Sequence, residues 1–308
     1  MGRYILKRVG AGLITIFVLI TITFFLMHAI PGGPFAPEEE KNVPKAVLDM
    51  LNERYGLDKP VHEQFLTYLT NVFKGDFGAS YKRANVTVNR LLSSGFPISA
   101  RVGVLAIVVS LGLGVPLGII SAVRRGRWPD YASMAFATIG ISAPAFVISV
   151  ALLYLFSMHL RWLPSFGLTS WKHYVLPVAC LSFHPIAYIA RQIRSSMLDA
   201  LQQDYTRTAR AKGVSEAMVV CKHALRNSIL PVVTYMGPLV AGLLTGSFIV
   251  ERLFSIPGIG REYVSSVGDR DYTLIMGMTT FFGIFVIICN IVVDVCYALI
   301  DPRVKITE

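Results

Sequence analysis

Long apolar stretches alternate with shorter polar ones along the whole chain. The first of them, residues 9–30, holds no charged side chain over 22 residues, and a helix of that length crosses about 30 Å of hydrocarbon. Five further stretches have the same character: 102–123, 132–158, 174–189, 229–250 and 274–300. The pattern predicts an all-α integral membrane protein with six transmembrane helices. We expect the first helix to be retained, because its apolar run is too long for a signal peptide.

Composition and charge agree with this class of protein. Hydrophobic residues make up 54% of the 308 residues and charged residues 16%, whereas about 25% of an average soluble domain is charged. Fifteen Lys and Arg lie in segments on the side of the N-terminus, and five in the two short segments on the other side. Basic residues are retained on the cytoplasmic side. We therefore expect both termini to be cytoplasmic, and lipid rather than nucleic acid to be the partner of this basic chain.

A longer polar segment, residues 31–97, separates the first two spans and is expected outside the cytoplasm. It carries eight basic and eight acidic residues and is therefore neutral. Apolar residues recur with helical spacing at 44–55 and 61–74, and Gly56 and Gly75 follow these two runs. The segment is predicted to form a small extracytoplasmic cap with two amphipathic helices, either a passive surface or a docking surface.

The polar stretch at 191–228 holds a predicted short helix of about two turns. Asp204 is expected to cap its N-terminus, and Arg210 and Lys212 are expected in its last turn, at the negative end of the helix dipole. Gly213 supplies the left-handed residue that commonly ends a helix. Ser215 then starts a second helix that leads into the next span.

Small residues and prolines recur within the predicted spans. Small residues let helix backbones approach closely, and proline removes a backbone hydrogen bond and kinks a helix. The candidate hinge and packing positions are Pro116, Pro144, Pro231, Gly237, Pro238, Gly242 and Gly246. Asp294 is the one acidic residue inside a predicted span. A packing role near the cytoplasmic end of its helix and a role in transport both remain open.

Several kinds of chemistry are missing from the sequence. There is no P-loop to hold ATP phosphates, no zinc-binding His-Glu-x-x-His helix and no nucleophile elbow. The potassium-channel filter motif is absent too. The four cysteines have no metal-ligand spacing. The sequence therefore predicts a transport subunit that is not an enzyme, needs no cofactor and depends on an outside source of energy.

The polar stretch closely resembles the cytoplasmic loop of permease subunits of ATP-binding-cassette (ABC) importers, in which a short coupling helix docks on the ATPase. Arg207-Thr208-Ala209, Gly213 and Ile229-Leu230-Pro231 occupy the places of that family's pattern. The usual Glu is absent and the spacing to the proline is long, as in the peptide-permease branch. Further similarities lie at 31–35, 55–57, 75–78, 256–260, 290–294 and 301–302, and the resemblance runs from Arg8 to Arg303.

The resemblance implies a B-type permease subunit of an oligopeptide ABC importer, with a type I importer fold in a bacterial inner or plasma membrane. Its expected parts are residues 1–30, the cap at 31–97 and a five-helix core at 98–308 that includes the coupling loop 191–228. The implied partners are a homologous second permease in a heterodimer, two cytoplasmic ATPase subunits, an extracytoplasmic peptide-binding protein and the peptide itself. The implied ATPase-coupling residues are Asp204, Tyr205, Arg207, Thr208, Ala209, Arg210, Lys212 and Gly213.

Two alternatives stay open at this point. The same family also serves dipeptides, glutathione and nickel complexes. A protein of another class, a secondary transporter working alone, would need no ATPase.

Overall fold

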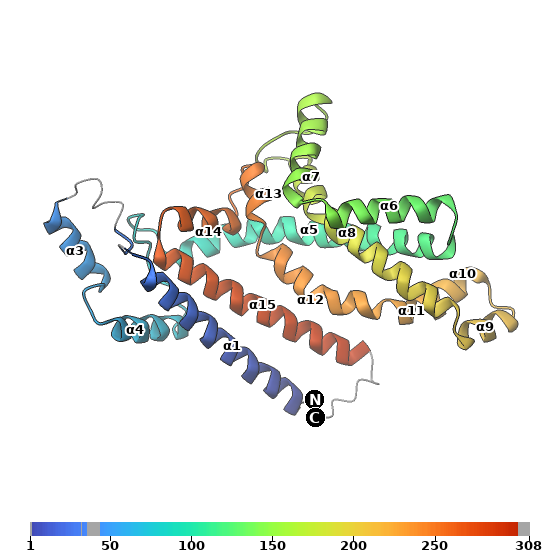
Figure 1. Ribbon diagram of the computed structural model, residues 1–308, viewed down its shortest axis with the longest axis horizontal. Coiled ribbons are helices and arrows are strands. Elements are labelled where there is room, and N and C mark those ends of the chain that lie inside the picture. The colour runs from blue at the N-terminus through green and yellow to red at the C-terminus, as the bar shows by residue number, and fades with distance from the viewer. Residues whose placement is uncertain (1, 32, 36–43, 301–308) are drawn as a thin grey trace. The chain divides into compact units, whose positions relative to one another are not determined.

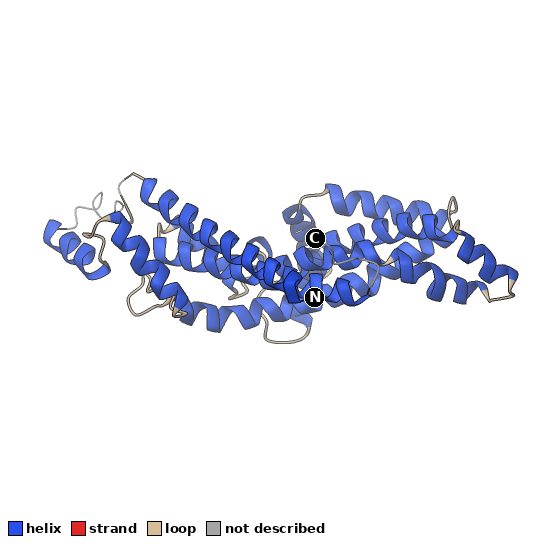
Figure 2. Cartoon of the chain, turned by 90° about the horizontal axis from the view of Figure 1, so that it is seen from below, coloured by secondary structure: helices blue, strands red, loops and turns tan. Residues whose placement is uncertain are grey.

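The computed structural model describes residues 2–31, 33–35 and 44–300, with side chains from residue 6 to residue 295. Nearly all of this described part is helical (Figure 2), and its one β-type pairing is an isolated bridge between Ala79 and Thr87. The predicted all-α class is confirmed. The last residues of the predicted C-terminal similarity, Asp301 and Pro302, lie outside the described residues.

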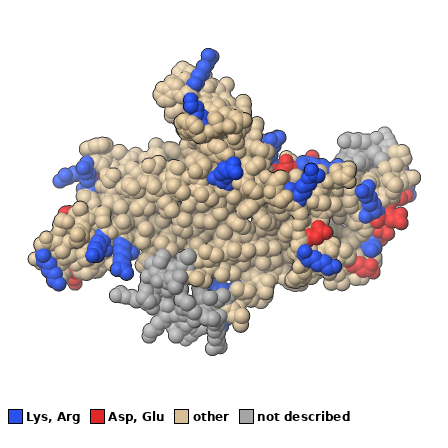
Figure 3. All heavy atoms as spheres, turned by 180° about the vertical axis from the view of Figure 1, so that it is seen from behind, with Lys and Arg blue, Asp and Glu red and all other residues tan. Residues whose placement is uncertain are grey.

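Among the described residues, five helices are long and apolar enough to cross a membrane. They are Leu6–Ala29, Val88–Val123, Lys172–Leu201, Leu230–Leu253 and Tyr272–Val295. A bent pair, Trp128–Ser142 with Ala145–His159, makes a sixth span if it is counted as one. On the face drawn in Figure 3, charged side chains are sparse over a broad uncharged surface. Such a surface is expected where helices face lipid.

The predicted span at 132–158 is not a single straight helix. It consists of α6 (Trp128–Ser142), α7 (Ala145–Leu152) and a π-helix, η1 (Leu153–His159), with a bend of 112° between α6 and α7. Ala143 is extended there (φ −77°, ψ 131°) because proline at the next position disfavours the helical conformation. Pro144 therefore breaks the span rather than only kinking it.

Two helices extend well beyond their predicted apolar cores. Helix α5 (Val88–Val123) begins inside the predicted outer segment, and α8 (Lys172–Leu201) continues through the first part of the predicted polar loop. The predictions at 102–123 and 174–189 were too short because hydropathy marks where lipid ends, whereas backbone hydrogen bonding continues in water.

The chain divides into two compact units. Of the described residues, those up to Ile98 and Pro257–Ile291 make up the first. Within it, α1 (Gly2–Ala29) and α15 (Tyr272–Ile300) lie side by side (Figure 1). A Cβ at Gly12 of α1 would come within 2.7 Å of Ile287 of α15, so the missing side chain permits their close approach.

The two predicted cap helices are present in the first unit as α3 (Lys45–Tyr55) and α4 (Val61–Phe73). Leu48 of α3 is buried, and Phe65 of α4 packs edge-on against Phe24 of α1 with ring centroids 5.2 Å apart. Phe73, predicted on the apolar face, is 81% exposed. A further helix, α14 (Ile259–Gly268), precedes α15 and contributes to the small core around Val88 and Met278.

The second unit comprises Ser99–Ile256 and the described residues from Val292 to Ile300, and its core lies along α8. Helix α8 packs against α6 and α5, and Ile189, Ile193 and Met197 are fully buried. After α8 come α9 (Asp204–Ala211), α10 (Glu216–Met218), a π-helix η2 (Val219–Ala224), α11 (Leu225–Ser228), α12 (Leu230–Leu244) and α13 (Phe248–Leu253). Gly246, at φ +83°, lies in the break between α12 and α13.

The candidate hinge residues differ in their surroundings. Pro231 begins α12, where a missing N–H costs nothing, and Pro238 lies inside the same helix. Gly237 is buried, whereas Pro116 and Gly242 are exposed. None of these observations tests a hinge role, which stays a prediction. Asp294 is half-buried on α15, and both roles proposed for it also remain predictions.

Candidate functional site

Helix α9 is the short helix predicted at the centre of the polar stretch. Its eight residues make a rod of about 12 Å, joined to the end of α8 by only Gln202 and Gln203. The N-cap is Gln203, so the prediction that Asp204 caps the helix was wrong. The Asp204 carboxylate is exposed and lies 3.8 Å from Arg207 Nη1. It still occupies the first turn, where the helix dipole favours an anion.

A threonine that the sequence reasoning passed over fixes the start of α9. Thr206 is fully buried, and its hydroxyl donates to the carbonyls of Gln203 at 2.6 Å and Leu201 at 3.1 Å. Ala209, three residues on and therefore on the same face, is 6% exposed. The sequence signal for this buried face was the pair of small residues, Thr206 and Ala209, at positions i and i+3 of the helix. These two side chains form the inner face of α9, which packs against η2 and the end of α8.

The end of α9 follows the prediction closely. Gly213 has φ +76°, the left-handed conformation. Its N–H donates to Arg210 O at 2.9 Å, and the N–H of Val214 donates to Ala209 O at 3.2 Å. This is the Schellman pattern, which satisfies the last carbonyls of a helix. Lys212, expected in the last turn, is the C-cap residue.

An ion pair closes the turn after Gly213. Arg210 donates from Nε and Nη2 to the two carboxylate oxygens of Glu216, at 3.0 and 2.7 Å. The Arg210 guanidinium lowers the pKa of Glu216, and the hydrogen bond to Glu216 raises the pKa of Arg210. Ser215 is the N-cap of α10 as predicted, although its side chain makes no capping hydrogen bond. The turn between α9 and α10 is therefore held by backbone and side-chain bonds together.

The outer face of α9 is exposed. It presents Tyr205, Arg207 and Thr208 to solvent, and Met218 on α10 is also half-exposed. Exposed apolar or aromatic side chains outside the membrane spans are typical of an interaction surface. The predicted coupling residues thus divide into an inner one, Ala209, and an outer group that is free to touch another protein.

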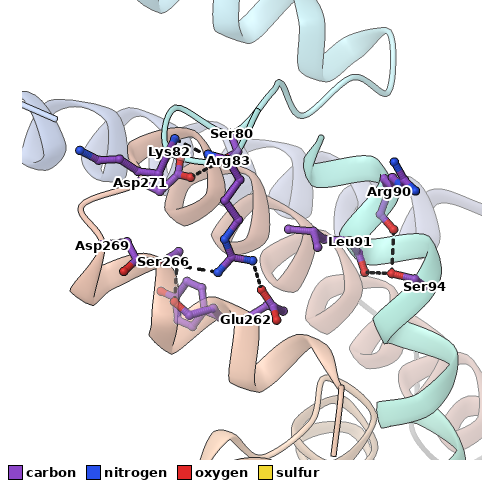
Figure 4. Close-up of polar contacts among 11 residues, drawn as sticks. Ser80, Lys82, Arg83, Arg90, Leu91, Ser94, Glu262, Ser266, Asp269 and Asp271 are labelled. Carbon is purple, nitrogen blue, oxygen red and sulfur yellow. Dashed lines mark hydrogen bonds and ion pairs between the residues drawn. The ribbon is translucent and has the colours of Figure 1, made fainter. Parts of the chain in front are cut away.

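A second polar cluster, also missed by sequence reasoning, lies in the first unit (Figure 4). The loop before α5 is held to α14 and to the turn after it: Arg83 Nη1 donates to Glu262 Oε2 of α14 at 2.6 Å, and Ser80 Oγ donates to Asp271 Oδ2 in the turn at 2.5 Å. The bond to Glu262 raises the pKa of Arg83. Asp271 is 1% exposed. The partners are about 180 to 190 residues apart, so no local pattern announces them.

Comparison with known proteins assigns the family. A family model described as "Binding-protein-dependent transport system inner membrane component" matches residues 114–306, and the model for the N-terminal part of such membrane components matches residues 1–97. The chain belongs to this family. Its members are membrane-spanning transport subunits, and ATP is hydrolysed by a separate subunit. As a member, the chain partners with another permease, an ATPase and a binding protein.

Curated relatives match over the full length. A dipeptide transport system permease protein, DppB, of Bacillus subtilis is 46% identical over 306 residues, covering 99% of both chains. An oligopeptide transport system permease protein, OppB, of Haemophilus influenzae is 40% identical over 308 residues, covering 99% of this chain and 100% of the relative. The predicted resemblance to peptide permeases is confirmed.

Solved structures agree on the fold. An inward-facing structure of the MetNI methionine ABC transporter matches with a TM-score of 0.54 at 17% identity, over 68% of this chain and 96% of that one. A crystal structure of an amino acid ABC transporter with histidines matches with a TM-score of 0.50 at 18% identity, over 70% of this chain and 95% of that one. The chain has the fold of ABC importer permeases.

Proposed function

We propose that this chain is the permease subunit of a peptide importer, and that α9 is the helix through which ATP hydrolysis drives it. Support for the substrate comes from the two full-length relatives named for dipeptide and oligopeptide transport. The observation that carries the coupling role is the one-sided burial of α9. Thr206 and Ala209 are buried against the chain's own helices, whereas Tyr205, Arg207 and Thr208 face outward.

The energy source must be a partner. The sequence has no P-loop, so the chain depends on ATPase subunits, which we propose to be two, each contacting one permease of a heterodimer. A peptide-binding protein would deliver the substrate to the opposite side of the membrane. Alternating access needs contacts that differ between the two states, and we assign those contacts to the exposed face of α9.

The proposed orientation places both termini and α9 in the cytoplasm. It is supported by the fifteen-to-five imbalance of basic residues. In a variant lacking the four native cysteines, a cysteine at Asp58 should react with a membrane-impermeant thiol reagent added from outside. A cysteine at Ala217 should react only after the membrane is opened. Both native residues are exposed, and the reverse labelling pattern would contradict the orientation and the coupling role together.

The substrate is tested on the complete transporter. We expect its binding protein, purified from the cell, to carry peptides that mass spectrometry identifies. Proteoliposomes that contain the complex should take up those peptides only when ATP is enclosed in the lumen, at the cytoplasmic face of the complex. Bound nickel or glutathione without peptide would refute the peptide assignment. Uptake that persists without ATP and without the ATPase subunits would refute the importer mechanism itself.

A further inference from the structure

Asp130, in the first turn of α6, accepts four hydrogen bonds within the second unit. It is 3% exposed. Its Oδ1 accepts from Arg194 Nε and Ser121 Oγ, both at 2.6 Å. Its Oδ2 accepts from Arg194 Nη2 and from the N–H of Gly126, both at 2.9 Å. The Arg194 guanidinium therefore binds the Asp130 carboxylate in a bidentate geometry, which fixes both the distance between the two groups and their relative orientation.

These four bonds join three elements. Ser121 is in the last turn of α5, Gly126 is in the turn that follows it, and Arg194 is on α8. Helices α5 and α8 also approach each other closely one turn earlier along each helix. A Cβ at Gly118 of α5 would lie 2.7 Å from Ala190 O of α8. Helices α5, α6 and α8 are thus joined both through apolar packing and through the four directional bonds to Asp130.

The position of the pair relative to α9 is what gives it a role. Arg194 lies seven residues before Leu201, the last residue of α8, which is about 10 Å along the helix axis. After Leu201, two residues lead into α9, and Thr206 of α9 is bonded back to the Leu201 carbonyl. A movement of α9 is therefore passed directly to the end of α8 through this two-residue connection and this bond.

Apolar contacts alone let a helix slide or rotate against its neighbours, because such contacts have no direction. A bidentate ion pair whose carboxylate is buried and whose guanidinium is 26% exposed adds little net stability, since desolvation offsets the attraction, but its hydrogen bonds have a fixed direction. On the basis of the proposed function, we propose that Asp130 and Arg194 are positioning residues that lock α8 to α5 and α6, so that movement of α9 is passed to the other membrane helices.

The test replaces the pair by apolar residues of similar size, Asp130→Leu with Arg194→Met, in the complete transporter. Such replacements of a buried ion pair are often neutral for folding, and Ser121 can then donate to its own helix, as Ser110 does to Ala106 O. We expect normal assembly and continued ATP hydrolysis, with the number of peptides imported per ATP falling at least about fivefold, the lower end of usual coupling effects.

Two further variants complete the test. Arg194→Lys keeps the charge but loses the planar fork, so we expect it to assemble fully and to show an intermediate number of peptides per ATP; it serves also if the double variant fails to assemble. Arg191→Met removes an exposed charge from the same helix and should change nothing. An unchanged peptide-to-ATP ratio in the double variant, or in Arg194→Lys should the double variant not assemble, would overturn the inference. Absence of ATP-driven peptide uptake by the wild-type complex would instead overturn the proposed function.

Discussion

Replacing Gly213 by valine tests whether α9 must be held at a fixed angle. A Cβ at Gly213 would meet no atom within 4 Å, so the penalty is backbone strain alone, about 1–3 kcal/mol for a residue forced into the left-handed region. If the chain escapes the strain by changing φ, it loses the bonds from Gly213 and Val214 to the carbonyls of Arg210 and Ala209. Each is worth about 0.5–1.5 kcal/mol. A loss of one or two kcal/mol lowers the population of the native conformation relative to its alternatives about 5- to 30-fold.

The chain offers a matched control in the outer cap. Gly56 ends α3 with the same Schellman pattern, at φ +67°. Its N–H donates to Glu53 O at 3.1 Å, and the N–H of Leu57 donates to Asn52 O at 2.8 Å. Gly56→Val therefore imposes nearly the same local strain as Gly213→Val, at a place that has no role in the proposed coupling.

The assay uses reconstituted complexes with the ATPases and the binding protein. We expect both variants to insert and to co-purify with their partners. Gly213→Val should lose at least about fivefold in peptide-stimulated ATP hydrolysis and in uptake, whereas Gly56→Val keeps its stimulated hydrolysis. Gly213→Asn should be less harmful, because asparagine tolerates the left-handed region. Full transport by Gly213→Val, or equal losses in both valine variants, would refute the idea that α9 must be fixed.

Three other outcomes are expected. Ala209→Asp puts a carboxylate on the buried face of α9 and should lower the unfolding midpoint of the complex, whereas Ala211→Asp puts the same carboxylate on the exposed face and should leave the midpoint unchanged; thermal unfolding compares them, and equal midpoints would contradict the packing. Ser80→Ala leaves the buried Asp271 carboxylate without a hydroxyl donor and should cost about 1–3 kcal/mol, seen as a lower unfolding midpoint, which an unchanged midpoint would contradict. The pKa of Glu216 is lowered by its arginine partner, so the pair contributes fully above the unfolded pKa and loses its contribution as the pH falls through the lower, folded one. The exposed pair is worth about 0.2–1 kcal/mol. The local stability of the turn, measured by hydrogen exchange, should therefore be lower in Glu216→Gln than in the wild type at neutral pH and equal to it in acid. A difference in stability that stays constant from pH 7 to pH 3 would disprove the linkage.

Local chemistry could be predicted from the sequence, and non-local pairing could not. The stop of α9 depends on one residue, Gly213, whose lack of a side chain is visible in the sequence, and its φ of +76° was anticipated. The bond between Asp130 and Arg194 joins residues 64 positions apart. Arg194 instead looked like one of many cytoplasmic cations. The apolar run predicted at 174–189 stops before Arg191 and Arg194, whereas α8 continues to Leu201 because its backbone hydrogen bonds do not depend on hydropathy.

Two buried carboxylates on the helices around α5 are bonded to serines near the two ends of its long apolar stretch. Ser121 Oγ donates to Asp130, and Ser99 Oγ donates at 2.6 Å to Glu251, which is 4% exposed. The two serines are 22 residues apart on one helix, about 33 Å at the α-helical rise, which matches a hydrocarbon core of about 30 Å. A charge at the bilayer centre costs about 2.5–3.5 kcal/mol on insertion scales. The spacing therefore predicts that each carboxylate lies near one boundary of the membrane rather than in its middle. This placement lets the second unit keep buried, directional bonds at both ends of the span, while the stretch between them packs through apolar side chains and glycines.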